Sequence, residues 1–348
     1  MEKNTVCLVV IVYNNENTIL QLLQSVQQLC DYYVIYDNAG GSTDNTKNII
    51  DQFQEDHPDK LIAYNYYNKP FHSGDKRTAA ISIAHDLVKT GWMADVDYLL
   101  IMDADNTLEA VPEPIGDNKA MFVNLTAQSY LITKKSGSIK YPIVSLLRAD
   151  LQWKYTGVIH EYPELATGEP FEQLLLPGVV IHEPVKEIGE GAGQRSRLHY
   201  YRHALLLEDQ LINNLQLTPF LQFRYMFYLA QSYRDCGMIE RAIDAYKSRC
   251  NMGGWDEEVF YSLLSIARLT GDLVDAIRAW EYRPQRLEAA LHLMHCYIAL
   301  KFHSAAYSVG WLSRDRPCND MLFIEHETYT KLFPELMAGL QEKINLQV

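Results

Sequence analysis

The chain has 348 residues, of which 48% are hydrophobic and 22% charged, a composition typical of a folded protein with one large or two ordinary domains. Asp and Glu number 44 against 31 Lys and Arg, and the net charge of −13 argues against nucleic-acid binding through bulk positive charge. The longest apolar run, residues 6–12, is far shorter than the about 20 residues of a membrane-spanning helix. We therefore expect a cytoplasmic protein with no membrane span, whose six cysteines are reduced.

The first half of the chain alternates strand-like apolar runs with segments whose apolar residues have helical spacing. In chain order, the predicted elements are strand 6–12, helix 17–29, strands 32–36 and 61–66, helix 77–89, and strands 98–102, 120–125, 128–133, 143–147 and 175–181. This alternation predicts an α/β fold with a mostly parallel, Rossmann-like sheet. In such a sheet, the functional site lies at the carboxyl ends of the strands.

From about residue 198 the sequence predicts helices only, and a repeat of 34 residues runs through them. Five positions recur at this spacing: Met226, Leu229, Gly237, Ala242 and Tyr246 return as Phe260, Leu263, Gly271, Ala276 and Trp280. This period, with small residues where helices cross, is typical of tetratricopeptide helix pairs. We therefore predict an α/β domain over residues 1–210 and a tetratricopeptide-like domain over residues 211–348. Such repeats bind a protein partner or mediate homodimerisation.

Two carboxylates, Asp103 and Asp105, follow the strand at residues 98–102. Carboxylate oxygens suit hard divalent cations, and two of them leave coordination positions for the oxygens of a diphosphate. The structural alternative is that both aspartates only stabilise a turn, where Asp is common. Asp37 also ends a predicted strand, and a carboxylate there can accept hydrogen bonds from a base or a ribose.

Two later segments add further candidate groups. Trp153, a glycine and the pair His160-Glu161 suit a site where a sugar stacks on a ring and a carboxylate or imidazole removes a proton. His182 ends an apolar strand, where a neutral imidazole can complete a metal shell. A lone tryptophan or histidine is more often structural, so the order of the motifs along the chain carries the hypothesis.

A glycine-rich stretch at residues 189–193 lacks the spacing of a dinucleotide fingerprint, and no P-loop pattern occurs in the chain. NAD enzymes and P-loop ATPases are therefore disfavoured. We interpret the stretch as a loop followed by Arg195 and Arg197, which can close over phosphates. A flexible linker with solvated arginines is the alternative.

Taken in this order, the motifs resemble the nucleotide-sugar-dependent glycosyltransferases of the GT-A fold, in particular the inverting family 2. The resemblance rests on residues 13–16 after the first strand, the block DNAGGSTDNT at residues 37–46, and MDADN at residues 102–106. The second half, including YLAQSYRDCG, GGWDEEVFYSL, EYRP and MLFIE, resembles the repeats of glycosyltransferases fused to tetratricopeptide repeats. Together the two resemblances cover nearly the whole chain.

The resemblance implies a donor site and a metal site. The residues implied to contact the base, the uridine side, the ribose and the phosphates are Asp37, Glu16, Asp103, Arg77, Arg195 and Arg197. The residues implied to hold Mn²⁺ or Mg²⁺ are Asp103, Asp105 and His182. Thr78 follows Arg77 where the family has asparagine.

The implied activity is metal-dependent, inverting transfer of a sugar from a nucleotide-sugar donor, a UDP-sugar favoured, to a hydroxyl of a glycan or a protein acceptor. Glu161 matches the position of the catalytic base, and His160 is the alternative because an imidazole titrates near neutrality. The main rival is a non-catalytic tetratricopeptide adaptor with a vestigial GT-A domain. A nucleotidyltransferase is disfavoured because no glycine-rich, lysine-bearing loop lies near residue 1. The acidic composition makes DNA the least favoured acceptor.

Overall fold

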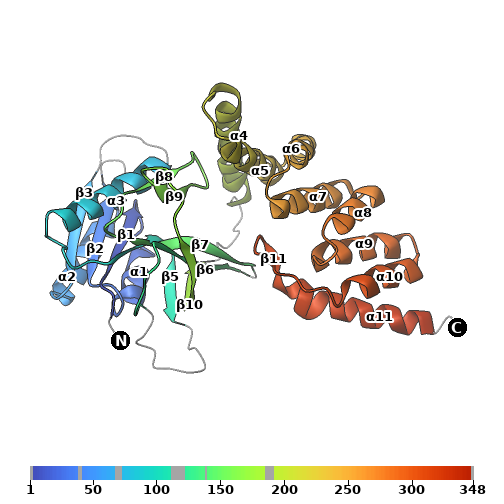
Figure 1. The fold of residues 1–348 in the computed structure, drawn as a ribbon, viewed down its shortest axis with the longest axis horizontal. Coiled ribbons are helices and arrows are strands. Elements are labelled where there is room, and N and C mark those ends of the chain that lie inside the picture. The colour runs from blue at the N-terminus through green and yellow to red at the C-terminus, as the bar shows by residue number, and fades with distance from the viewer. Residues whose placement is uncertain are drawn as a thin grey trace. The chain divides into compact units, whose positions relative to one another are not determined.

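The computed structural model describes residues 3–37, 41–66, 73–110, 122–137, 139–184 and 192–345, and the chain divides into two compact units, Met1–Lys186 and Glu187–Val348 (Figure 1). A mixed, mostly parallel sheet fills the first unit and helices fill the second, which confirms the predicted fold class. The predicted boundary at residue 210 lies inside helix α4 (Ala192–Asn213). Because α4 packs along α5 (Pro219–Cys236), it belongs to the helical unit.

The sheet of the first unit has the strand order β3-β2-β1-β4-β7-β6-β10-β5. Its strands are β1 (Val6–Val12), β2 (Tyr32–Asp37), β3 (Leu61–Tyr66), β4 (Tyr98–Asp103), β5 (Thr107–Ala110), β6 (Ser129–Ser136), β7 (Ile139–Arg148) and β10 (Gln173–Glu183). Strands β3, β2, β1 and β4 are parallel neighbours, and β7 runs antiparallel to both β4 and β6. The chain leaves β1 toward β2 on one side and returns at β4 on the other. A crevice for a ligand forms at the carboxyl ends of the strands at such a point.

Strand β1 is buried on both faces, which explains its continuous apolar sequence. Leu8 and Val10 pack with helix α1 (Ile19–Val26), while Cys7 and Val9 pack with side chains of helix α3 (Ser73–Lys89). Successive side chains of a strand point to opposite faces, so the two helices cover opposite sides of the sheet. Helix α2 (Thr46–Asp56) adds Ile50 and Phe53 to the α1 side.

Some predicted elements differ from those observed. The strand predicted at residues 120–125 is absent from its described part, residues 122–125, where Val123 makes only an isolated bridge with Lys3. Asn124 has a φ of 52°, which interrupts an extended strand. The hairpin of β8 (Trp153–Thr156) and β9 (Tyr162–Leu165) was not predicted, because four-residue strands give too short a pattern to recognise.

The second unit is a series of helices in which most pack on the next through a short connection (Figure 1). A longer segment, residues 314–325, precedes the last helices and ends in the short strand β11 (Ile324–Glu325). After α5 come α6 (Ile239–Met252), α7 (Asp256–Thr270), α8 (Leu273–Tyr282), α9 (Leu287–Ala299), α10 (His303–Ser313), the π-helical turn η1 (Thr328–Leu332) and α11 (Phe333–Asn345). Gly237 and Gly271 both end a helix in the left-handed conformation, with φ of 89° and 65°. Ala242 and Ala276 are both fully buried in the following helix. Positions 34 residues apart are therefore structurally equivalent; the tetratricopeptide identity stays a prediction.

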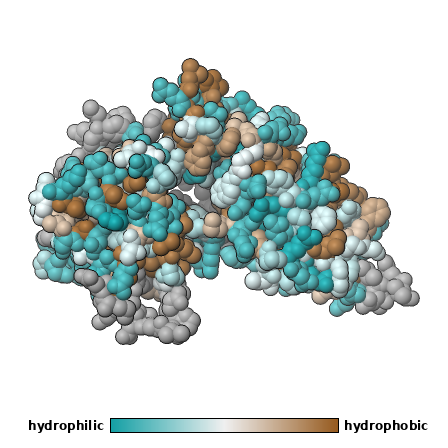
Figure 2. Space-filling model, viewed as in Figure 1, coloured by the Kyte–Doolittle hydropathy of each residue, from teal (hydrophilic) through white to brown (hydrophobic). Residues whose placement is uncertain are grey.

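Hydrophilic side chains cover much of the visible surface, and a group of hydrophobic ones lies at the end of α4 (Figure 2). Along α4 the exposed hydrophobic residues Leu198, Tyr201, Leu205 and Ile212 have spacings of three, four and seven residues, which place them on one side of the helix. Of the helices that the structure describes, none combines the length and the apolar character needed to cross a membrane.

Candidate active site

The loops after β1 and β2 are tied together at the carboxyl end of the sheet. Asp37 is 1% exposed, and its carboxylate accepts hydrogen bonds from the backbone N–H and the hydroxyl of Ser42 at 2.8 and 3.0 Å. Glu16 accepts a hydrogen bond of 3.0 Å from the backbone N–H of Asn45. Both predicted nucleotide-binding carboxylates therefore lie at the predicted edge, where they also order the loop backbone.

Asp103, at the end of β4, lies between two cations. Arg77 of α3 donates to one carboxylate oxygen, and the Lys134 ammonium of β6 lies 3.4 Å from the other. Lys134 also lies 3.5 Å from the carboxylate of Glu183 at the end of β10. Four elements, α3, β4, β6 and β10, thus bring opposite charges to one point at the edge of the sheet.

Arg77 connects this point to the candidate base. Its Nε donates a 2.7 Å hydrogen bond to Glu161, whose side chain is 9% exposed. The contacts therefore form a continuous chain from Lys134 through Asp103 and Arg77 to Glu161. Arg77 also lies over the ring of Tyr155, with 5.6 Å between the guanidinium carbon and the ring centre.

The charges of this chain shift the pKa values of its members. Burial alone would raise the pKa of Asp103, but Arg77 and Lys134 outweigh it and lower the pKa below the ordinary value. Burial would lower the pKa of Arg77 and of Lys134, yet Asp103 and the other neighbouring acidic groups raise both. All three side chains are thus charged at neutral pH. Before a donor binds, the positive charges of Arg77 and Lys134 are compensated by carboxylates of the site.

The loop between β8 and β9 sets the position of Glu161. Gly157 has a φ of 118°, and a Cβ there would lie 3.3 Å from the Cα of Glu161, so the turn requires glycine on both counts. His160 has a φ of 50° and an exposed side chain. The hydroxyl of Thr78 accepts a 2.8 Å hydrogen bond from the backbone N–H of Tyr155, which fastens the hairpin to α3 one residue after Arg77.

Trp153 is a core residue and offers no platform for a sugar. It is 3% exposed, stands edge-on to Phe171 with 4.9 Å between ring centres, and its indole N–H donates to the backbone C=O of Arg148 at 2.9 Å. The aromatic ring beside Arg77 is that of Tyr155, two residues later. Trp153 and Tyr155 are two residues apart and share a face of β8, but only the ring of Tyr155 lies beside Arg77.

The described residues test whether a divalent metal fits at Asp103, Asp105 and His182. Asp103 contacts a cation with each oxygen, which makes it the least suited of the three. The Nε2 of His182 is buried and lies against the carboxylate of Glu109. An imidazole nitrogen beside a carboxylate is a donor set that Mn²⁺ accepts.

Asp105 lies in the turn between β4 and β5, which a 3.0 Å hydrogen bond from the Asn106 N–H to the Asp103 C=O closes. His182 pairs with Thr107, two residues beyond Asp105. The backbone thus keeps Asp105 and His182 in neighbouring positions. Across the described parts of the chain, no three His, Cys, Asp or Glu side chains converge as a ready metal cluster. Asp105 and His182 therefore fit a metal that takes its other ligands from a bound phosphate.

The two later arginines belong to the helical unit. Residues 189–191 of the predicted glycine-rich loop lie outside the described residues, and Arg195 falls in the first part of α4, where the structure describes no side chains. Arg197 is described and exposed, and its guanidinium lies 4.0 Å from the position that a Cβ of Gly237 would occupy. It is thus placed beside the carboxyl end of α5, where a positive charge is stabilising.

Sequence analysis missed Lys134, Glu183 and Tyr155. Lys134 and Lys135 look like an ordinary exposed pair in the sequence, but they point to opposite faces of β6. Lys134 has a side chain that is 9% exposed. The alternation of buried Tyr130 and Ile132 along this strand was the signal available, because it predicts that residue 134 also points inward.

No family model matches the chain, and no curated protein sequence matches it. Among solved structures, the mannosyltransferase PcManGT from Pyrobaculum calidifontis, in complex with GDP-Man and Mn²⁺, is similar to it. The match covers 87% of this chain and 88% of that chain, at 16% sequence identity and a TM-score of 0.39. A likeness of this extent is too weak to assign a substrate or a reaction to the chain.

Proposed function

We propose that this protein is a metal-dependent, inverting glycosyltransferase of the GT-A type that transfers a sugar from a nucleotide-sugar donor to a hydroxyl of a glycan or a protein. One observation carries the proposal: the chain of charges from Lys134 through Asp103 and Arg77 to Glu161 at the carboxyl end of β4. This chain links two cations that could bind an anionic leaving group, Lys134 and Arg77, to a carboxylate that could accept a proton, Glu161. The sequence resemblance supports the donor class and favours UDP.

The cations of this chain are the groups that would hold the donor diphosphate. Arg77 and Lys134 have side chains 23% and 9% exposed, so a phosphate there would be shielded from water and bound strongly. Phosphate oxygens would compete with Asp103 for both cations and leave its carboxylate for the ribose. Asp37 and Glu16, at the neighbouring strand ends, are proposed to contact the base.

Asp105 and His182 are the proposed protein ligands of Mn²⁺ or Mg²⁺, with Asp103 next to them. When bound, the metal would neutralise the negative charge that builds on the departing diphosphate. Arg77 and Lys134 add charge stabilisation from the protein itself. Arg195 and Arg197 remain proposed phosphate contacts.

Glu161 is the proposed base. The Arg77 Nε donates a 2.7 Å hydrogen bond to its carboxylate, and the side chain is only 9% exposed. These contacts hold the carboxylate in an orientation that could accept a proton from an acceptor hydroxyl. In the absence of donor the guanidinium engages this carboxylate. When a diphosphate draws Arg77 away, Glu161 loses the hydrogen bond from this guanidinium and becomes more basic, so the base becomes competent as the donor binds. His160 is the alternative base, one residue earlier in the same loop.

The test is hydrolysis of a panel of nucleotide sugars by the purified chain with saturating manganese, for wild type beside Asp105→Ala. We expect slow release of the nucleotide from one sugar and at least a tenfold or so loss in the variant, since the metal would lose a ligand. Asp51→Ala is the matched control, since this aspartate of α2 is 53% exposed and its carboxylate pairs with Lys47, away from the proposed metal ligands. Inactivity of the wild type with every sugar, together with no binding of any nucleotide, would favour the adaptor interpretation.

A further inference from the structure

Two neighbouring residues of α3 contact the two ends of the loop that carries Glu161. The Nε of Arg77 donates a 2.7 Å hydrogen bond to the Glu161 carboxylate. The hydroxyl of Thr78 accepts a 2.8 Å hydrogen bond from the backbone N–H of Tyr155. Tyr155 lies in β8, before the loop, and Glu161 lies at its far end, directly before β9. One short stretch of α3 therefore fastens this loop at both ends.

The two contacts differ in how they respond to an anionic ligand. The contact between Arg77 and Glu161 is an ion pair, and the phosphates of a donor can compete for the guanidinium. The contact between Thr78 and Tyr155 joins a neutral hydroxyl to a neutral amide, so a phosphate gains no ion pair by replacing it. Binding of a diphosphate at Arg77 is therefore expected to release the first contact and to leave the second in place.

The backbone transmits the contact at Tyr155 to Glu161. Thr156 pairs with Tyr162 across the hairpin, so the residues between them form a short loop closed by the two strands. Inside this loop the chain folds back tightly, because a Cβ on Gly157 would lie 3.3 Å from the Cα of Glu161. A displacement of β8 away from α3 would therefore move Glu161 with it.

We propose that Thr78 is a positioning residue for the base. It keeps the loop against α3 while a donor diphosphate engages Arg77, so that the Glu161 carboxylate stays where the acceptor hydroxyl arrives. The ring of Tyr155 lies 5.6 Å from the guanidinium carbon of Arg77, so the residue that Thr78 fixes also borders the path of the guanidinium. This inference rests on the proposed function, in which Arg77 binds the diphosphate and Glu161 takes the proton.

The kinetic test compares Thr78→Val with Thr78→Ser in the full chain. The reaction is hydrolysis of the donor identified with the panel, in which water takes the place of the acceptor. Valine has the shape of threonine but cannot accept the hydrogen bond, whereas serine keeps the hydroxyl. We expect valine to lower kcat at least about tenfold and to change the KM for the donor less than about threefold, because the base is displaced and the phosphate contacts remain. Serine should keep kcat within about threefold of wild type.

Thr90→Val is the matched control. This threonine directly follows α3, is exposed, and donates from its hydroxyl to the C=O of Leu87 at 3.2 Å. Its replacement should leave kcat and KM unchanged. An equal loss of kcat in Thr78→Val and Thr90→Val would show that the effect comes from the stability of α3, and would overturn the inference.

A double variant shows whether Thr78 acts through the base. If it does, adding Thr78→Val to Glu161→Gln should lower kcat no more than about twofold further, because the group that Thr78 positions has already been removed. A merely structural role of Thr78 would instead multiply the two losses. Multiplied losses would therefore overturn the inference even if the single variants behave as expected.

Hydrogen exchange tests the hold of Thr78 on the loop without any activity. The amides of residues 155–162 should exchange at least about tenfold faster in Thr78→Val than in Thr78→Ser, while the amides of β1 exchange equally in both. Equal exchange of the loop in the two variants would overturn the inference, whatever the kinetics. A wild type that is inactive with every donor, together with the expected difference in exchange, would instead overturn the proposed function on which the role of the base depends.

Discussion

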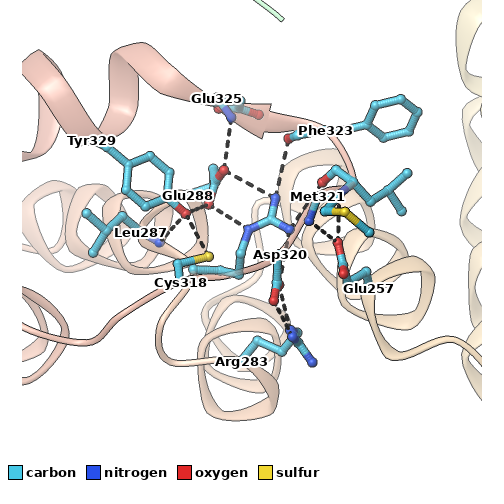
Figure 3. Close-up of polar contacts among 12 residues, drawn as sticks. Glu257, Arg283, Leu287, Glu288, Cys318, Asp320, Met321, Phe323, Glu325 and Tyr329 are labelled. Atoms are coloured by element: carbon cyan, nitrogen blue, oxygen red, sulfur yellow. Dashed lines mark hydrogen bonds and ion pairs between the residues drawn. The ribbon is translucent and has the colours of Figure 1, made fainter. Parts of the chain in front are cut away.

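Arg77 in the first unit and Arg286 in the second each lie between two carboxylates, yet the two arginines differ in their surroundings. The side chains of Arg77 and Asp103 are 23% and 39% exposed, against 1% and 0% for Arg286 and Glu288. Arg77 contacts carboxylates on separate elements, and each contact can be exchanged for a phosphate. Arg286 forms a bidentate pair with Glu288, and its other donors face the carboxylate of Asp320 and two main-chain carbonyls (Figure 3). The same ion-pair chemistry thus suits catalysis where solvent and ligand can enter, and architecture where they cannot.

The largest expected effect tests the charge cluster around Arg77. Replacing Glu161 by Gln should lower kcat for sugar transfer about 1,000-fold, because an amide keeps the hydrogen bond from Arg77 but cannot take a proton. The KM for the donor should change little. Steady-state kinetics with the donor found by hydrolysis measure both quantities. Glu164→Gln is the control, a carboxylate three residues later that contacts Lys154 and Thr156. A loss below tenfold in the Glu161 variant would point to His160 as the base.

The second-largest expected effect tests the buried pair of Arg286 and Glu288. Arg286→Ala should reduce the free energy of unfolding of the helical unit by about 3 kcal/mol or more, since it leaves the buried Glu288 without its cation. Urea unfolding followed by circular dichroism measures the change. Arg278→Ala is the control, because that arginine is 67% exposed and should lose no more than about 0.5 kcal/mol. If both variants lose the same small amount, the distinction between the two clusters fails.

A smaller effect separates the two lysines of β6. Lys134→Gln should raise the KM for the donor about tenfold and leave kcat within about threefold, because the ammonium binds phosphate before and during the reaction. Lys135→Gln changes the same residue type on the opposite face of the strand and should leave both constants unchanged. Equal effects of the two substitutions would remove Lys134 from the donor site.

The position of Lys134 beside Asp103 also illustrates what could not be predicted from the sequence. The strands of the first unit and their acidic carboxyl ends follow from local patterns, because a buried parallel strand is a continuous apolar run and its end is a polar residue. The positions of Asp37 and Asp103 were predictable for this reason. The cations around Asp103 come from α3 and β6, which are distant in sequence, and only the pairing of β6 with β7 and β10 places Lys134 there.

The hairpin around Glu161 and the segment at residues 320–325 could not be predicted, for different reasons. The two strands around Glu161 are too short to give a periodic signal, and their orientation depends on Gly157 and on the hydrogen bond from Tyr155 to Thr78. MLFIE, at residues 321–325, was recognisable as a motif of the repeat region, but the sequence does not show that the buried carboxylates of Glu257 and Glu288 bind its main chain. The 34-residue period, in contrast, was recognisable because Gly237 and Gly271 end equivalent helices.

The smallest expected effect concerns pH and the first unit alone. His85 of α3 is 5% exposed, and its Nδ1 lies 3.2 Å from the C=O of Ala149. Burial lowers the pKa of His85 below its ordinary value of 6.5, and Lys89 acts in the same direction. A histidine with a lowered pKa binds fewer protons folded than unfolded, so its contribution to stability is present above about pH 6.5 and is lost as the pH falls through the folded pKa.

His85→Asn removes this titrating group and keeps a polar side chain at the position. The unfolding free energy of the first unit should therefore fall less between pH 7 and pH 5 in the variant than in wild type, by about 1 kcal/mol at most. Urea unfolding at both pH values measures the difference, with a spectroscopic signal that reports on the sheet of the first unit. His326→Asn, at an exposed position of the helical unit, should leave the slope unchanged. An identical slope in wild type and His85→Asn would show that protonation of the buried imidazole costs no stability, against the lowered pKa that its burial implies.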